Sequence, residues 1–302
     1  MSGFTAKDVK ALRERTGVGM MECKKALQEA SGDFEKAILV LRKNGAAKAA
    51  KKADRVAAEG LVCVKVLGDA GVVLEVNSET DFVARNKDFV SFVGDLADTI
   101  LNENIKNLED LNNSKISGGS LLVKKALEEK ILAIGENIKI RRFERLNGNL
   151  VSYVHGGGKI GVLVQFGGDI DFKDPKFLEY GRNIAMQIAA ATPSYVNRED
   201  VPEDVLAKEE EVYKDQLRKL NKPDAVLNKI VKGKVDKFFA EVCLNEQQYV
   251  KDVSMSISEY TKSVCKDFNG DIKILKFIRM EKGEGLEKRS DNFADEVSGM
   301  LR

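Results

Sequence analysis

Candidate chemistry in this sequence is concentrated in one glycine-rich turn. His155 is the single histidine among 302 residues, so a Ser-His-Asp triad would have to use it. No G-x-S-x-G sequence, the turn that presents the nucleophile in many hydrolases, lies nearby. Gly156–Lys159 suggests a phosphate-binding loop, but that loop also needs glycine at the position of Tyr153 and Ser or Thr at that of Ile160. The sequence therefore predicts a hairpin turn that uses the positive φ of glycine, and no enzymatic activity.

Metal and disulfide chemistry are not predicted either. The acidic run Gly168–Asp174 lacks the glycine and the closing glutamate of a calcium-binding EF-hand loop. The cysteines are widely spaced and form no C-x-x-C pair: Cys23, Cys63, Cys243 and Cys265. A disulfide or a metal cluster is the alternative, but we expect reduced, mostly buried thiols in a cytosolic protein. We expect no bound metal and no other cofactor.

Composition and charge narrow the class of protein. Charged residues make up 32% of the chain and apolar residues 43%, which is typical of a globular protein. Lys and Arg (49) nearly balance Asp and Glu (48), so the net charge of +1 gives no drive toward nucleic acid or an anionic membrane. The sequence shows no apolar run of 18 residues, and its start resembles neither a signal nor a transit peptide. We expect a bacterial cytoplasmic protein that binds neither nucleic acid directly nor membrane.

One run of residues has an unusual composition for the end of a strand. Asn77–Arg85 follows the apolar run Val72–Val76, which predicts a buried strand. The chain then presents an acid and an aromatic, Asp81 and Phe82, where a turn residue is usual. A phenylalanine there either covers the protein's own core or anchors in a pocket of a partner.

The first 55 residues predict a small three-helix module and a linker. Thr5 and Asp8 form a capping-box pattern that opens the first helix, and Asp33 caps the third. Gly45 is expected to end the third helix, with the basic stretch 46–55 continuing as a helical linker. Three helices of this size are marginal as an independent fold.

The middle of the chain contains a repeat of a β-hairpin and a helix. The first copy has a hairpin over residues 62–76 and an apolar helix stripe that includes Phe89 and Ile100. The second copy has a hairpin over residues 151–166 and a stripe that includes Phe177 and Ile188. Asp81-Phe82 and Asp171-Phe172 fall ninety residues apart, in register with the repeat. The pattern predicts an α+β fold with two related subdomains, each an antiparallel sheet covered by helices.

The remaining segments complete the predicted organisation. Residues 105–118 are polar and rich in turn residues, a helix with Leu122 and Ile131 follows, and a strand over residues 137–145 comes next. Two charged helical runs make an antiparallel helical hairpin that projects from the body. The apolar residues of the first run are expected to face those of the second: Leu206, Tyr213, Leu217 and Leu220 face Leu227, Val231, Val235 and Phe238. A strand over residues 272–280 and a C-terminal helix capped by Asp291, with Phe293 and Val297 inward, end the chain. The predicted domains are 1–55, 56–147, 148–201 with 243–288, the hairpin 202–242, and the C-terminal helix 289–302.

Four runs of residues together resemble the translation elongation factor Ts family. They occur in the same order along the chain: Thr16–Lys25, Leu74–Asn86, Ile134–Arg142 and His155–Val164. The resemblance covers essentially the whole chain. It implies a nucleotide exchange factor for the translational GTPase EF-Tu, with no covalent chemistry and no cofactor. It leaves open a homodimer or a 2:2 complex with EF-Tu.

The resemblance also implies roles for individual residues. The three-helix module is expected to be UBA-like and to dock on the GTPase domain, with Arg13, Met20 and Met21 on the contact surface; core packing of one Met is the alternative. Thr80, Asp81, Phe82 and Val83 match the stretch that disturbs the Mg²⁺ and phosphate site of the partner. His155 matches a contact away from the nucleotide. Asp171-Phe172 is expected to be structural, because the surrounding Thr and Val-Ala-Arg are missing. The helical hairpin matches the protruding coiled coil of the family.

Two other functions are compatible with the sequence. The chain could be a UBA-like binding scaffold without exchange activity. It could also be a nucleotide-binding enzyme, but then the glycine-rich turn would have to hold phosphate.

Overall fold

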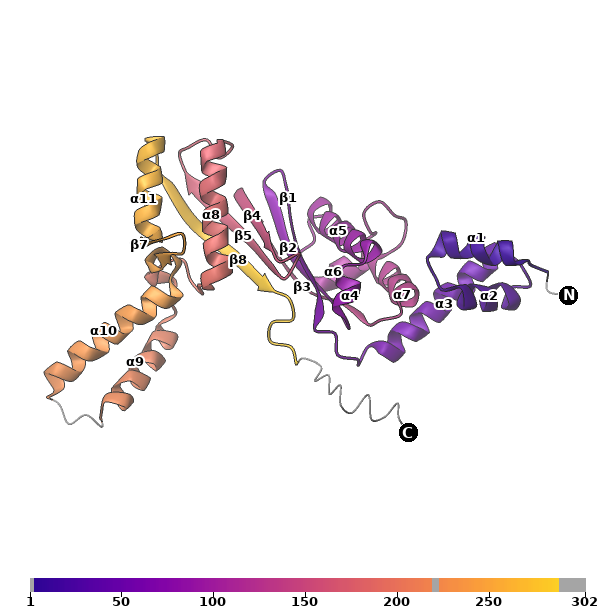
Figure 1. Ribbon diagram of the computed structural model, residues 1–302, viewed down its shortest axis with the longest axis horizontal. Coiled ribbons are helices and arrows are strands. Elements are labelled where there is room, and N and C mark those ends of the chain that lie inside the picture. The colour runs from indigo at the N-terminus through magenta and orange to yellow at the C-terminus, as the bar shows by residue number, and fades with distance from the viewer. Residues whose placement is uncertain (1–2, 219–222, 288–302) are drawn as a thin grey trace.

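The computed structural model describes residues 3–218 and 223–287, and Figure 1 shows their arrangement. Helices and small antiparallel sheets alternate along the chain, which confirms the predicted α+β class. The predicted helix over 289–302, with Asp291, Phe293 and Val297, lies outside the described residues, as does Leu220. The predicted domain boundaries stay predictions.

The N-terminal module consists of three helices whose ends follow from their sequence. They are α1 (Ala6–Thr16), α2 (Met20–Glu29) and α3 (Phe34–Lys52). The predicted capping box is present, because the Asp8 amide donates to the Thr5 hydroxyl and the Thr5 amide donates to the Asp8 carboxylate. Gly17 ends α1 at a φ of 70°, and Asp33 caps α3 by accepting from the amide of Lys36. The module encloses a small apolar core that includes Leu12 and Leu27.

The prediction that Gly45 ends the third helix is wrong. Helix α3 continues through Gly45 to Lys52, so the predicted linker is mostly part of α3. Gly45 is buried, and a Cβ there would lie 3.2 Å from the carbonyl oxygen of Glu128 in α7 (Val123–Ile134). The glycine therefore serves the close approach of two helices rather than a helix end. Leu132 of α7 packs into the core of the N-terminal module, so the module is joined to the rest of the chain by packing.

A first three-stranded antiparallel sheet leads into the run Asn77–Arg85, which begins at the end of its second strand. Its strands, in the order β1-β2-β3, are β1 (Glu59–Leu67), β2 (Ala70–Ser78) and β3 (Ile138–Asn147). Helix α5 (Lys87–Asn102) covers one face with the predicted stripe, including Phe89 and Ile100, fully buried. The sequence missed α6 (Leu108–Asn113) in the polar stretch, where the Asn107 side chain caps the helix and Leu111 is buried. Leu122 precedes α7 as its N-cap and is exposed, contrary to its predicted place in the helix stripe.

A second three-stranded sheet repeats this plan. Its strands, in the order β4-β5-β8, are β4 (Asn149–His155), β5 (Ile160–Gly168) and β8 (Ile272–Glu281). The predicted helix, α8 (Pro175–Ala191), and α11 (Ile257–Phe268) pack on it. Phe166, Phe177 and Tyr180 form an aromatic cluster in this core. Strand β8 comes from far along the chain, so the hairpin-and-helix unit is completed only by a distant segment.

The two sheets face each other through a third apolar layer. Val62 and Val73 from the first sheet meet Leu163 and Ile278 from the second. The strands therefore bury both faces, with helices α5 and α7 outside one sheet and α8 and α11 outside the other (Figure 1). The result is a helix–sheet–sheet–helix body.

The helical hairpin extends away from this body, as the sequence predicted (Figure 1). It consists of α9 (Glu203–Arg218) and α10 (Asp224–Val242), and Leu217 and Val231 are buried between them. Phe239, rather than the predicted Phe238, is the more buried aromatic, because it packs with Val201 and Cys243 at the base of the hairpin. Short elements complete that base: η1 (Arg198–Asp200), η2 (Leu244–Glu246), β6 (Gln248–Tyr249) and β7 (Asp252–Ser256).

Candidate functional site

Phe82 is the most exposed large apolar side chain in the described part of the protein. It lies in the single-turn helix α4 (Asp81–Ala84), directly after β2, and 82% of its surface is accessible. The next residue, Val83, is buried in the core of the first sheet. A side chain that covered its own core would be buried, so the alternative in which Phe82 acts as a lid is excluded. Val83 fixes the turn to the core, and Phe82 is presented to solvent.

The turn that carries Phe82 is held by residues from the segment after α7. The Thr80 amide donates to Oε2 of Glu136 at 2.9 Å, and the Thr80 hydroxyl donates to Oε1 at 2.7 Å. The Glu79 carboxylate accepts from the amide of Asn137 at 2.6 Å. Thr80 is the N-cap of α4, but its hydroxyl is used by Glu136 instead of capping the helix. The sequence singles out the run Ile134–Arg142 but does not reveal that this run braces the Phe82 turn.

The remaining charge at the turn is only weakly constrained. Asp81 pairs with Arg85 one turn later, with 3.3 Å between Oδ2 and Nη2. The side chains of Asp81 and Arg85 are 47% and 83% exposed, so the pair adds little to stability. The Asp81 carboxylate is therefore free to exchange this partner for a group on another protein at small cost.

A groove of about 630 Å³ lies beside Phe82. The end of α1 forms one side, with Arg15, Thr16 and Gly17, and the Phe82 turn, the 116–119 loop and α7 form the others. Charged side chains line it: Arg15, Asp88, Asp95, Glu129 and Lys130. Burial, with Asp98 nearby, raises the pKa of Asp95. The N-terminal module and the Phe82 turn thus border one continuous concave surface, although they are far apart in the sequence.

The predicted contact residues of the N-terminal module lie on its surface. Met20 and Met21 are 40% and 63% exposed at the start of α2, and Arg13 is exposed on α1. Neither methionine is in the buried core of the module, which counts against core packing of either one. Their role in binding a partner stays a prediction.

His155 ends β4 on the second sheet, outside the groove. Its ring Nδ1 lies 3.0 Å from the Tyr153 hydroxyl, and its side chain is exposed. Gly156, Gly157 and Gly158 all have positive φ, as the hairpin-turn prediction requires. The carbonyl oxygen of Gly158 accepts from the amide of Val62 in β1 at 2.7 Å. The turn therefore bonds to the first sheet, and its glycines serve backbone geometry.

The second Asp-Phe pair has a different environment, as predicted. Phe172 is half-buried and packs edge-on against Phe177, with 5.0 Å between the ring centroids. The repeat thus places one phenylalanine in a core and the other in solvent. This contrast marks Phe82 as the functional candidate.

Other kinds of site find no support in the described residues. Across residues 3–218 and 223–287, no group of three or more His, Cys, Asp or Glu side chains is arranged to hold a metal ion. Within the same part of the chain, every helix is too short or too polar to cross a membrane. The four cysteines are free thiols, and burial raises the pKa of Cys23, Cys63 and Cys243.

Comparison with known proteins gives one consistent answer. The family model described as Elongation factor TS matches residues 79–284. Elongation factor Ts of Clostridium perfringens (strain SM101 / Type A) is 46% identical, and the match covers 98% of this chain and 99% of that protein. Elongation factor Ts of Clostridioides difficile (strain 630) is 45% identical over the full length of both chains. That of Clostridium kluyveri is 48% identical over 97% of each.

Proposed function

The chain belongs to the elongation factor Ts family, and we propose that it releases GDP from EF-Tu by inserting Phe82 beside the nucleotide site. Family membership implies nucleotide exchange on EF-Tu during translation elongation, an activity that forms no covalent bond. The proposal adds the mechanism. Phe82 would enter between helices of the GTPase domain and disturb the Mg²⁺ and phosphate site of the partner, because Mg²⁺ tolerates distortion of its ligand shell poorly.

The exposure of Phe82 beside the buried Val83 is the observation that carries this proposal. A wedge must be apolar, accessible and rigidly mounted, because a flexible side chain would fold away instead of displacing another helix. The Thr80–Glu136 hydrogen bonds and the burial of Val83 supply that mounting. The resemblance implies that all four residues of the stretch act at the partner's Mg²⁺ site. In this proposal Thr80 and Val83, which is buried, act by holding the turn, and Asp81 and Phe82 act by touching the partner.

The energetics require more than one anchor. An exchange factor that weakens nucleotide binding must itself be bound less tightly by the same factor when nucleotide is present. A change of ~10⁴ in affinity needs about 5.5 kcal/mol of differential binding. Burial of one phenylalanine supplies about 1.5–3 kcal/mol. Phe82 alone is therefore insufficient, and the rest has to come from other contacts that form fully only when the nucleotide has left, because contacts present in both states shift nothing.

We assign docking, which holds the two proteins together with or without nucleotide, to the other predicted contacts. Arg13, Met20 and Met21 would dock the N-terminal module on the GTPase domain, where flexible Met side chains suit an adaptable apolar surface. His155 would contact the partner away from the nucleotide. We also propose that the protein acts in the bacterial cytoplasm, as a homodimer or in a 2:2 complex with EF-Tu, without binding nucleic acid directly.

Stopped-flow release of a fluorescent GDP analogue from EF-Tu tests the mechanism. The wild-type chain should accelerate release, and Phe82→Ala should reduce the maximal rate far more than it weakens docking. Phe172→Ala is the matched control, since it removes the equivalent aromatic of the second copy without touching the exposed turn. Equal losses of rate and affinity in Phe82→Ala would contradict the wedge.

The alternative function, a UBA-like binding scaffold without exchange activity, predicts another outcome in the same assay. The wild-type chain would then bind EF-Tu in a pull-down or titration but leave the rate of GDP release unchanged.

A further inference from the structure

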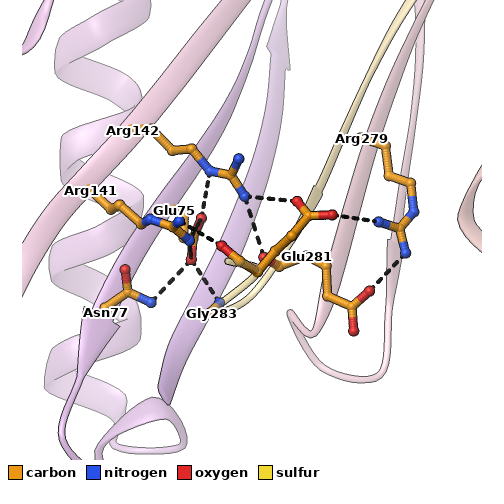
Figure 2. A network of polar contacts seen from close by, with 8 residues as sticks. Glu75, Asn77, Arg141, Arg142, Arg279, Glu281 and Gly283 are labelled. Atoms are coloured by element: carbon orange, nitrogen blue, oxygen red, sulfur yellow. Dashed lines mark hydrogen bonds and ion pairs between the residues drawn. The ribbon is translucent and has the colours of Figure 1, made fainter. Parts of the chain in front are cut away.

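A fully buried carboxylate lies between the two sheets. Glu75 in β2 is completely inaccessible to solvent, and Figure 2 shows the donors that surround it. Arg141 Nη1 lies 2.9 Å from Oε1 and 3.1 Å from Oε2, and Arg142 Nε lies 2.7 Å from Oε2. The Asn77 side-chain amide and the Gly283 backbone amide donate to Oε1 at 3.1 and 2.8 Å. The carboxylate is thus fully satisfied, which a buried charge requires.

A β-bulge brings two consecutive arginines to this one carboxylate. Successive side chains of a regular strand point to opposite faces of the sheet. The β2–β3 register pairs Glu75 with Arg142 but Val76 with Ile140, so Arg141 is an extra residue in β3. The extra residue shifts the alternation locally. Both guanidinium groups can therefore reach Glu75.

The fourth group at Glu75 belongs to the other half of the body. Gly283 follows β8, the edge strand of the second sheet, and has a φ of 71°. A Cβ at this position would lie 2.3 Å from the carbonyl oxygen of Ala58, so only glycine brings its amide this close. The two arginines extend the connection, because Arg141 Nη2 donates to the carbonyl of Glu284 at 2.5 Å and Arg142 Nη2 to its carboxylate at 3.1 Å. We call Glu75, Arg141, Arg142 and Gly283 the joint.

The joint is ionised in the folded protein. Burial alone raises the pKa of Glu75, but hydrogen bonds from Gly283, Arg142, Arg141 and Asn77 outweigh it, so the pKa lies below its ordinary value. A directional, charged contact of this kind restrains the orientation of the two sheets. Packing of Val62, Leu163 and Ile278 is not directional, so the charged contact restrains the angle between the sheets more sharply than the apolar layer does.

The joint lies on the path between the two candidate contact regions. On one side, β2 runs from Glu75 directly into the Phe82 turn. On the other side, the amide of Lys282 donates to the carbonyl of Lys159 at 2.9 Å, at the end of the turn that begins with His155. The neighbouring hydrogen bond from the Val62 amide to the Gly158 carbonyl joins the same turn to β1 of the first sheet. The orientation of the His155 turn relative to Phe82 thus depends on the segment that Glu75 holds.

We propose that Glu75 is a positioning residue that fixes the angle between the two sheets, so that Phe82 and His155 engage one partner molecule in register. This inference rests on the exchange function proposed above. Held in register, the second contact forms at high effective concentration after the first, which raises affinity without any additional contact. If the joint is loosened, the two contacts bind as separate, weaker sites, although neither has been altered.

The orientation of the sheets gives a direct test in the free protein. Residual dipolar couplings of backbone amides should fit one alignment tensor for both sheets in the wild type. Glu75→Gln removes the carboxylate charge that the two arginines share and should require a separate tensor for each sheet, or a reduced order for the second. Arg142→Lys is a milder variant in case Glu75→Gln fails to fold. It keeps the charge but loses the paired guanidinium contacts to Glu75 and Glu284. One shared tensor in a folded Glu75→Gln or Arg142→Lys protein would overturn the proposal.

Exchange kinetics provide the second test, as a double-mutant cycle with His155→Ala. In Glu75→Gln, release of GDP at sub-saturating factor should fall roughly tenfold, a typical size for coupling between sites. His155→Ala should lower the rate of GDP release much less in the Glu75→Gln protein than in the wild type. Glu246→Gln is the control, since it removes a carboxylate paired with Arg198 at the base of the helical hairpin, away from the joint. All rates are measured well below the melting transition of each variant.

The outcomes separate the joint from the exchange function. Additive effects of Glu75→Gln and His155→Ala, or an equal loss in Glu246→Gln, would assign Glu75 a role in stability alone and reject the positioning role. A wild-type chain that does not accelerate GDP release would reject the exchange function. The dipolar couplings would still decide whether Glu75 sets the angle between the sheets.

Discussion

Glu136 receives both donors of Thr80, the backbone amide at 2.9 Å and the hydroxyl at 2.7 Å, across 56 residues of sequence. The contact ties the turn before Phe82 to the segment that follows α7. A two-point attachment restrains the turn against rotation, which a single hydrogen bond would permit. The exposed Phe82 therefore projects from a fixed base.

Glu136→Gln should impair exchange without touching the partner. The neutral amide can keep both contacts by accepting from the Thr80 amide and donating to the Thr80 hydroxyl, but hydrogen bonds to a charged group are stronger, so the variant should lose about 1 kcal/mol in the free energy of unfolding. We expect a slower maximal rate of GDP release with near-normal docking, measured by stopped flow and titration. Glu144→Gln, on the exposed side of β3, is the control and should change neither. An unaltered release rate in Glu136→Gln would show that the charge of Glu136 is dispensable for exchange.

The double variant Met20→Ala/Met21→Ala should weaken docking and leave stability intact. Both side chains are exposed, so the free energy of unfolding should change by less than about 0.5 kcal/mol. Affinity for EF-Tu should fall, while the release rate at saturating factor should stay near that of the wild type. Leu39→Ala, which removes an exposed apolar side chain from α3, controls for general surface effects. A marked loss of thermal stability in the double variant would restore the core-packing alternative.

His155→Ala should also act on affinity, because its side chain is exposed outside the groove. Loss of one polar contact corresponds to about 1 kcal/mol, or roughly a fivefold weaker complex. Tyr153→Phe removes only the hydroxyl that lies against the imidazole and separates an effect on its orientation from loss of the ring. Isothermal titration with EF-Tu measures both. Identical affinities for wild type and His155→Ala would remove this residue from the interface.

Two helical glycines give a matched test of the packing between α3 and α7. Alanine favours helix by about 1 kcal/mol over glycine in an open position. A methyl group added at Gly94 in α5 would have no atom within 4 Å, so Gly94→Ala should stabilise the protein. At Gly45 the same methyl would lie 3.2 Å from the backbone of α7, so Gly45→Ala should destabilise it. Chemical denaturation compares them, and equal stabilisation by both would refute the close-approach explanation.

Acid should destabilise the folded protein partly through Glu75. Its pKa is lowered on folding, so the unfolded chain binds the proton more readily. This contribution is present above the ordinary pKa of Glu, about 4.3, and is lost as the pH falls from there through the lower folded pKa. Thermal unfolding between pH 6 and 3 should therefore show that stability falls more steeply with decreasing pH in the wild type than in Glu75→Gln. Parallel curves would mean that Glu75 contributes no pH dependence.

Local signals in the sequence determined the elements well. The capping pattern of Thr5 and Asp8, the apolar stripe from Phe89 to Ile100 and the glycine turn after His155 all act within a few residues. Caps, helix periodicity and turn glycines depend on neighbouring residues, so the chain reveals them directly. The repeat likewise singled out Phe82 and Phe172 as equivalent positions.

Contacts between distant segments became visible only in the folded protein. Gly45 looks like a helix end until α7 is brought against it, and α6 is missed because its one buried leucine has no local pattern. Glu136 and Glu75 gave no local sign of their partners, which come from 56 and up to 208 residues away. Most helices, strands and turns could be predicted from the residues alone, because those choices follow largely from local backbone and side-chain chemistry; α6, α11 and the end of α3 could not. Only the packed structure decided that Phe82 is exposed while Phe172 is covered, because burial depends on which distant segments lie against a side chain.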